Sequence, residues 1–136
     1  MKNPHHHLLP DRPDQPVILI VDDDVLILNV ARVTMERDGY FVLTAEDGDD
    51  ALHLSRNYPG DIHLLLTDVR MPRMSGIQLG KRVQKERPET RVLLMSGAFD
   101  ENNPGFTLLH KPFGITKLSE TVKGLLPPIQ KREQGA

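Results

Sequence analysis

The sequence predicts an α/β fold, a doubly wound five-stranded parallel sheet with helices on both faces. Short continuous apolar runs, each the length of a buried strand, alternate along the chain with longer segments whose apolar residues recur at helical spacing. Parallel strands are covered on both faces and therefore read as unbroken apolar runs. Because right-handed crossovers connect such strands, their carboxyl ends should all meet at one edge of the sheet.

Length and composition narrow the class of protein. The chain has 136 residues, enough for one domain with a single core. Its formal net charge of −2 predicts no general attraction to nucleic acid or to an anionic membrane. It contains no cysteine, which excludes disulfides, thiolate metal sites and a cysteine nucleophile. We therefore expect a soluble cytoplasmic protein with neither a nucleic-acid nor a membrane partner.

The chain should divide into three parts. Residues 1–15 are rich in proline and should form a flexible N-terminal arm. Residues 16–127 carry the alternating strands and helices and should form the folded domain, and residues 128–136 should form a polar C-terminal tail. The run His5-His6-His7 in the arm is either a metal-binding tract or a solvated tail, and three histidines together favour the tail.

The first half of the domain should contain three strands and two helices. The strands are expected at Val17–Val21, Tyr40–Ala45 and Ile62–Thr67. Asp24 can cap a first helix that ends at Gly39, and a second helix should run from about residue 49 to residue 57. The apolar residues on one face of the first helix are Leu26, Ile27, Val30 and Val33.

The second half should add two helices and two strands. They are expected at Ser75–Arg87 (helix), Arg91–Met95 (strand), Thr107–His110 (strand) and, for the last helix, along the stripe Ile115, Leu118, Val122 and Leu125. Between Ser96 and Thr107 the chain is too short for two loops and a full helix. Residues 102–105, Asn-Asn-Pro-Gly, have turn chemistry, so we expect at most one helical turn in this link.

Acidic residues follow two of the predicted strands. Asp22, Asp23 and Asp24 come directly after the first, and Asp68 follows the third. If these strands are neighbours, the carboxylates crowd one sheet edge, where ligands bind in open α/β sheets. Crowded carboxylates raise each other's pKa unless a cation joins them, and oxygen ligands with room for water favour Mg²⁺.

Four motifs occur in a set order along these elements. They are Ile20–Asp24, Leu65–Gly76, Met95–Ala98 and Lys111–Phe113. In sequence and order they resemble the receiver domain of response regulators, the phosphoacceptors of two-component signalling, over roughly residues 16–127. The resemblance implies a flavodoxin-like sheet with strand order 2-1-3-4-5. The segments around Asp68 and Ser96 look most like receivers attached to hybrid sensor kinases.

The resemblance also implies a site. Asp68 would be the phosphoacceptor, and Ser96 and Lys111 would contact phosphoryl oxygens. The ligands of Mg²⁺ would be Asp22, Asp23, Asp68 and the backbone carbonyl of Arg70. The partner would be a sensor histidine kinase or a histidine phosphotransfer protein, with no small-molecule substrate beyond phosphodonors. Such a domain is not an enzyme, apart from its self-phosphorylation from a phosphodonor and its slow self-dephosphorylation.

The sequence departs from the family in two places. Leu108 stands where receivers commonly carry Tyr or Phe, three residues before the lysine, and the fourth helix should be shortened to the loop Asp100–Gly105 or absent. Both departures leave open how phosphorylation would be transmitted. The alternative is a pseudo-receiver, an interaction module that is not phosphorylated. An Asp-nucleophile phosphohydrolase is disfavoured, because Arg70 occupies the position of its second acid–base Asp.

Overall fold

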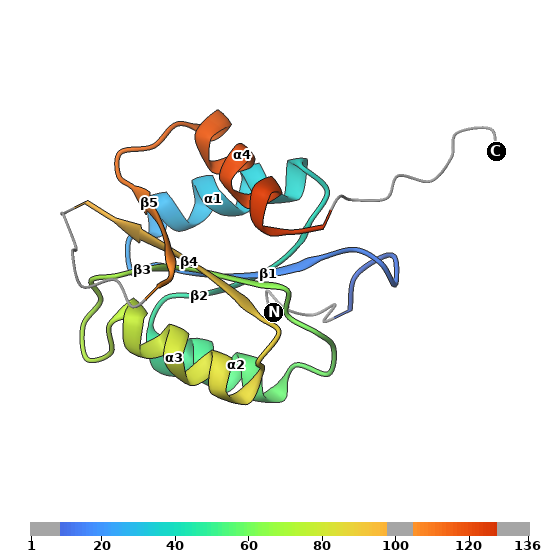
Figure 1. The fold of residues 1–136 in the computed structure, drawn as a ribbon, viewed down its shortest axis with the longest axis horizontal. Helices are drawn as coiled ribbons and strands as arrows, with labels where there is room; N and C mark the ends of the chain where they lie inside the picture. The colour runs from blue at the N-terminus through green and yellow to red at the C-terminus, as the bar shows by residue number, and fades with distance from the viewer. Residues whose placement is uncertain (1–8, 98–104, 128–136) are drawn as a thin grey trace, which may run out of the picture.

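The computed structural model describes residues 9–97 and 105–127, and it contains one five-stranded parallel sheet (Figure 1). The strands are β1 (Val17–Val21), β2 (Phe41–Ala45), β3 (Leu64–Asp68), β4 (Arg91–Ser96) and β5 (Thr107–His110). The helices in the described residues are α1 (Val25–Arg37), α2 (Gly48–Asn57), α3 (Gly76–Glu86) and α4 (Ile115–Leu125). The strand order is β2-β1-β3-β4-β5, which confirms the predicted fold and order.

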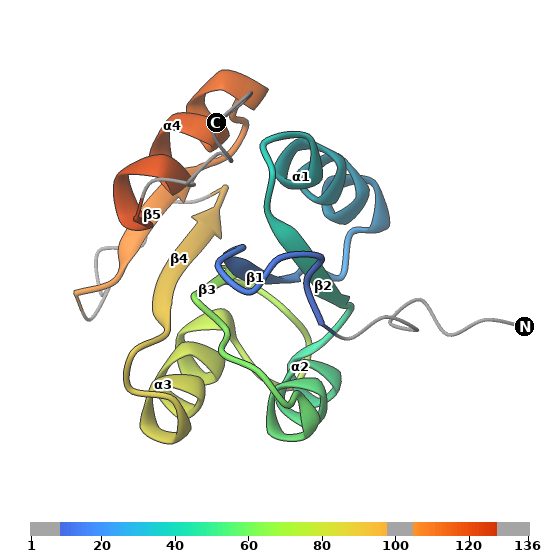
Figure 2. The same ribbon diagram turned by 90° about the vertical axis from the view of Figure 1, so that its right-hand side faces the viewer.

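The helices cover both faces of the sheet. Figures 1 and 2 show α1 and α4 on one face and α2 and α3 on the other. Along β1 the side chains alternate between the two layers: Leu19 packs in the core on the α2–α3 side, whereas Ile18 and Ile20 pack on the α1–α4 side. All of them are buried, so the predicted link between unbroken apolar runs and a two-sided parallel sheet is confirmed.

The predicted boundaries differ by one or two residues where polar groups end an element. β3 begins at Leu64, although the His63 backbone still bonds to both neighbouring strands: its N–H donates to the Val17 carbonyl at 2.9 Å, and its carbonyl accepts from the Arg91 N–H at 3.1 Å. The His63 Nδ1 also accepts from the Val17 N–H at 3.0 Å. At its other end β3 extends to Asp68, and β4 extends to Ser96. Two candidate site residues therefore occupy the last positions of strands, where the sheet fixes their backbone.

Helix α1 carries two apolar surfaces. The residues buried against the sheet and α4 include Leu28, Ala31 and Met35. Of the four residues predicted to share one apolar face, Ile27 packs against this core, whereas Leu26, Val30 and Val33 lie on the other side of the helix and are 77%, 52% and 53% exposed. A single contact with the sheet can cover only one side of a helix, so the second apolar stripe is left at the surface. We refer to Val25, Leu26, Val30 and Val33, all exposed, as the α1 face.

The link between β4 and β5 is only partly described. The expected turn at 98–104 lies outside the described residues, and neither Gly97 nor residues 105–106 are helical. Phe106 packs onto α3 at Gly80, where an added Cβ would lie 3.0 Å from its ring. Leu108 is partly buried and packs against the α2–α3 core, so its side chain has a fixed place in the fold. Among the described helices, none has the length and apolar character needed to cross a membrane.

Candidate functional site

Three carboxylates meet where β1 and β3 end. Asp22, Asp23 and Asp68 each offer one oxygen, and these three oxygens lie within 4.8 Å of one another. Asp22 is fully buried and Asp68 nearly so, whereas Asp23 is exposed. The predicted crowding at one sheet edge follows from the topology, because β1 and β3 are parallel neighbours whose register ends at the pair Val21 and Thr67.

Asp24 does not join this cluster and instead organises the turn. Its backbone N–H donates to Oδ1 of Asp22 at 2.8 Å, which holds that buried carboxylate in place. Its own carboxylate accepts hydrogen bonds from the N–H groups of Leu26 and Ile27 and so caps α1. One residue thus fixes the start of the helix and the orientation of its acidic neighbour.

Lys111 brings a positive charge to the cluster. Its Nζ lies 3.2 Å from Oδ2 of Asp22 and 3.2 Å from Oδ1 of Asp68. Lys111 follows β5, and its backbone N–H donates to the Ser96 carbonyl at 2.7 Å, so the ends of β4 and β5 are tied together. Ser96 is buried and follows Met95, which lies opposite Asp68 in the β3–β4 register.

Burial governs the electrostatics of the cluster. It raises the pKa of the Asp68 carboxyl above its ordinary 3.8, and the charge of Asp22 adds to this rise against the opposing pull of Lys111. Burial also raises the pKa of Asp22, against the hydrogen bond from Asp24 and the charge of Lys111. Burial disfavours the charged form of Lys111, but attraction to both carboxylates outweighs it and raises the pKa of Lys111 above 10.5.

The donor set suits a small divalent cation. With all groups ionised, three carboxylates face one ammonium, which leaves two negative charges uncompensated. Carboxylate oxygens on one exposed and two buried residues can hold a hard cation and leave room for its water, as Mg²⁺ requires. The side chain of Arg70 is exposed. The predicted role of its backbone carbonyl as an Mg²⁺ ligand stays a prediction.

Comparisons with known proteins agree with this arrangement. The sequence profile of the family described as "response regulator receiver domain" matches residues 18–123. The chain belongs to this family. The receiver domain of the hybrid histidine kinase CckA has a similar structure: the TM-score is 0.73 at 36% identity, over 82% of this chain and 99% of that one. A CheY-like receiver from Methanospirillum hungatei gives a TM-score of 0.74 at 29% identity, over 81% and 92%.

Similar sequences occur inside longer proteins. Sensor kinase CckA of Brucella abortus is 33% identical over 117 residues, which make up 81% of this chain but 12% of that protein. The alkaline phosphatase synthesis regulator PhoP of Bacillus subtilis is 29% identical over 116 residues, 80% of this chain and 48% of that protein. The chain therefore spans half or less of the length of these relatives, and the likeness concerns their receiver part.

Two residues of the receiver site escaped the sequence reasoning. An added Cβ on Gly76 would lie 2.1 Å from the Asp68 carbonyl oxygen, so only glycine allows α3 to start this close to the end of β3. Thr67 is fully buried, and its hydroxyl donates to that same carbonyl at 3.0 Å. A glycine immediately after the helix cap Ser75, where it is a poor helix former, is the signal that could have indicated such a close approach.

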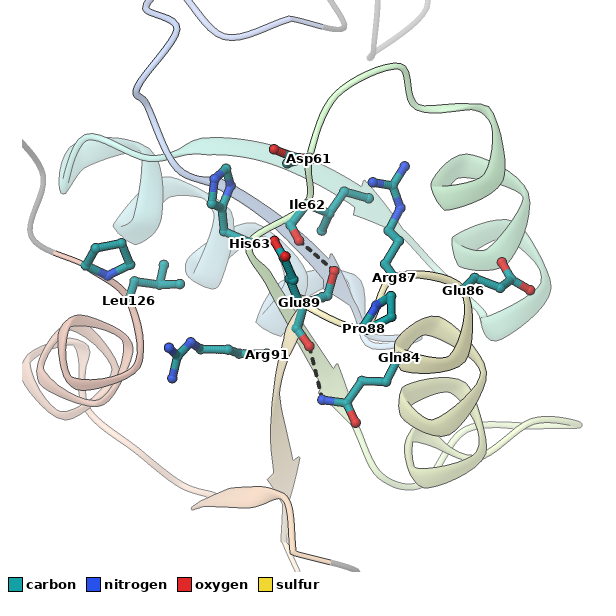
Figure 3. Close-up of a pocket in the computed structure, with 12 residues that line it drawn as sticks. Asp61, Ile62, His63, Gln84, Glu86, Arg87, Pro88, Glu89, Arg91 and Leu126 are labelled. Atoms are coloured by element: carbon teal, nitrogen blue, oxygen red, sulfur yellow. Dashed lines mark hydrogen bonds between the residues drawn. The ribbon is translucent and has the colours of Figure 1, made fainter.

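Two hollows formed by the described residues lie at opposite edges of the sheet. Figure 3 shows the larger, about 870 Å³, between the start of β3, the end of α3 and the end of α4. Its polar groups bond to one another, as when Gln84 donates to the Thr90 carbonyl and the Thr90 hydroxyl to the Ile62 carbonyl. Its charges, on Asp61, Glu86, Glu89, Arg87 and Arg91, are mixed in sign. It lies away from the acidic cluster and resembles a surface depression more than a second site.

The second hollow, which we call the groove, adjoins the acidic cluster. It measures about 550 Å³ and is lined by Leu26, Ile27, Val30, Gly97, Lys111, Pro112 and Phe113. Its walls are almost entirely apolar, and Lys111 belongs both to this groove and to the acidic cluster. The groove is continuous with the α1 face through Leu26 and Val30, so an apolar surface leads directly to the carboxylates.

Proposed function

We propose that this receiver accepts a phosphoryl group on Asp68 from a phosphohistidine of a partner protein, with Mg²⁺ held by Asp22 and Asp23. The observation that carries the proposal is the position of Lys111 Nζ, 3.2 Å from carboxylate oxygens of both Asp22 and Asp68. Phosphoryl transfer depends on positioning and on charge neutralisation more than on covalent chemistry. An ammonium shared by the acceptor and a metal-binding carboxylate supplies both.

Asp68, Lys111 and Ser96 have separate roles in the proposed transfer. A carboxylate oxygen of Asp68 forms the new bond to phosphorus while the phosphorus–nitrogen bond of the donor histidine breaks. The imidazole of the donor leaves as a neutral group, because the second ring nitrogen of the phosphohistidine is protonated. Lys111 is placed to pair with a phosphoryl oxygen, and the Ser96 hydroxyl at the end of β4 can donate to another. Bound Mg²⁺ would neutralise negative charge on the phosphoryl oxygens.

Labelling with acetyl phosphate tests the acceptor. With Mg²⁺ present, the wild-type protein should gain one phosphoryl group, detected by intact-protein mass spectrometry. Asp68→Asn should abolish the gain, because the amide is not a nucleophile. Asp24→Asn should be labelled like the wild type, because Asn also caps a helix. Unlabelled wild-type protein would favour the pseudo-receiver, and a labelled Asp68→Asn variant would show that the acceptor is another residue.

We further propose that the α1 face and the adjoining groove bind the partner helix that presents the phosphohistidine. The exposed side chains Leu26, Val30 and Val33 recur at helical spacing, and such a ridge packs well against another helix. The groove ends at Lys111, so a helix seated there would bring its histidine to Asp68. The chemistry fits an amphipathic helix of a histidine kinase or of a histidine phosphotransfer protein.

Leu26→Gln should slow phosphoryl transfer from a protein donor about tenfold, because it removes much of the stabilisation from burying one leucine in the interface. The donor is the fastest of a panel of autophosphorylated histidine-kinase cores. The matched control is Leu9→Gln, the same change at a leucine that is 60% exposed and lies outside the α1 face. Acetyl phosphate needs no docking surface, so it should label both variants at the wild-type rate. Equal transfer to both variants would contradict the docking proposal.

A further inference from the structure

The phosphoacceptor extends beyond the strand that neighbours it. In the β1–β3 register the last pair is Val21 with Thr67, so Asp68 has no β1 residue opposite it. On its other side Asp68 still lies opposite Met95 of β4, and the next N–H, that of Val69, donates to the Met95 carbonyl at 2.9 Å. The Asp68–Val69 peptide is thus tied to β4 by its N–H, and its carbonyl needs a separate partner.

Thr67 provides that partner. Its hydroxyl is fully buried and donates to the Asp68 carbonyl at 3.0 Å. The Sδ atom of Met71 lies 4.0 Å from the same hydroxyl. The hydroxyl therefore contacts both the last residue of β3, before Arg70, and the loop residue Met71, after it. A valine would fill the same volume without these polar contacts, so packing alone does not require a threonine here.

We propose that Thr67 is a positioning residue: its hydroxyl fixes the Asp68 peptide and the start of the β3–α3 loop in the orientation that Mg²⁺ binding requires. The proposal rests on the proposed function, because it assigns Thr67 a role toward the ion held by Asp22, Asp23 and Asp68. Gly76 supports the same geometry, since its lack of a Cβ leaves room for the carbonyl that Thr67 holds. Thr67 itself contributes no ligand atom and acts only through the backbone of Asp68.

Thr67→Val should raise the dissociation constant of Mg²⁺ about fivefold, which corresponds to about 1 kcal/mol, the usual net contribution of one hydrogen bond. Isothermal titration of the full chain with MgCl₂ measures this constant. Labelling by acetyl phosphate should slow at low Mg²⁺ and recover at saturating Mg²⁺, a pattern that a general loss of stability would not give. Thr67→Ser keeps the hydroxyl and should bind Mg²⁺ like the wild type.

The matched control is Thr90→Val. Thr90 is also buried, and its hydroxyl donates to the Ile62 carbonyl at 2.6 Å, at the opposite end of the sheet. Thr90→Val should lower the urea midpoint and leave the Mg²⁺ dissociation constant unchanged. Equal Mg²⁺ affinity in Thr67→Val and the wild type would overturn this inference alone, as would a loss of affinity in Thr67→Ser equal to that in Thr67→Val. A wild-type protein that binds no Mg²⁺ and takes no label would overturn the proposed function as well.

Discussion

Gly76→Ala should be among the most damaging single substitutions in this receiver, with a loss of about 3 kcal/mol or more in the free energy of unfolding. The added Cβ would lie 2.1 Å from the backbone carbonyl oxygen of Asp68. That oxygen cannot move aside easily, because Thr67 donates to it and the N–H of Val69 is bonded to β4. Either α3 or the end of β3 must shift, so Mg²⁺ binding and labelling of Asp68 should be lost together with stability.

Two other glycines should show smaller effects of substitution by alanine. An alanine Cβ at Gly80 would lie 3.0 Å from the Phe106 ring and 3.1 Å from Val92, both side chains that can yield, so its cost should be smaller. At Gly124, in α4, nothing lies within 4 Å, and Gly124→Ala should stabilise the helix by up to about 1 kcal/mol. Urea denaturation of the three variants gives the comparison. A Gly76→Ala protein as stable as the wild type would show that the carbonyl of Asp68 is free to move.

The sequence was sufficient for those parts of the site that depend on topology. A buried apolar run followed by Asp22, and a second followed by Asp68, predict neighbouring carboxylates, because parallel strands end at one edge. The family resemblance implied only that Lys111 contacts a phosphoryl oxygen. Its pairing with both carboxylates was not predicted, since nothing in local spacing places residue 111 beside residue 22. Thr67 and Gly76 could not be assigned at all, because their roles rest on contacts with one carbonyl oxygen whose direction the sequence does not specify.

Helix α1 shows a different limit of sequence reasoning. Its apolar residues are numerous enough for two stripes, and periodicity alone cannot say which stripe meets the sheet. The choice is made by the partners: Leu28, Ala31 and Met35 face Ile18 and Ile20 across the interface. Leu26 and Val30 are consequently exposed, beside a groove that ends at Lys111. The apolar face that the pattern assigned to the core is therefore the surface that we propose for binding the partner helix.

Mg²⁺ should stabilise the folded receiver strongly, and more so as the pH rises from about 4 toward neutrality. At about a hundred times the dissociation constant, the free energy of unfolding should rise by about 2.7 kcal/mol. The pH dependence follows from burial, which raises the pKa values of Asp22 and Asp68 above 3.8. Without metal, the stability contributed by these carboxyls is complete below pH 3.8 and is lost as the pH rises through their folded-state pKa values. Mg²⁺ requires the ionised forms, so its effect grows over the same range.

Three variants separate these contributions in urea denaturation with and without Mg²⁺ at several pH values. Asp22→Asn should flatten the fall in metal-free stability above about pH 4, because it removes one buried charge. Asp23→Asn should remove most of the Mg²⁺-dependent shift and change the metal-free curve little, because Asp23 is exposed. Asp24→Asn should keep both effects, since Asp24 caps α1 and acts on Asp22 only through its backbone N–H. If Asp23→Asn retained the full shift, the ion would have to be held by other groups, and the repulsion among the three carboxylates would be relieved by Lys111 alone.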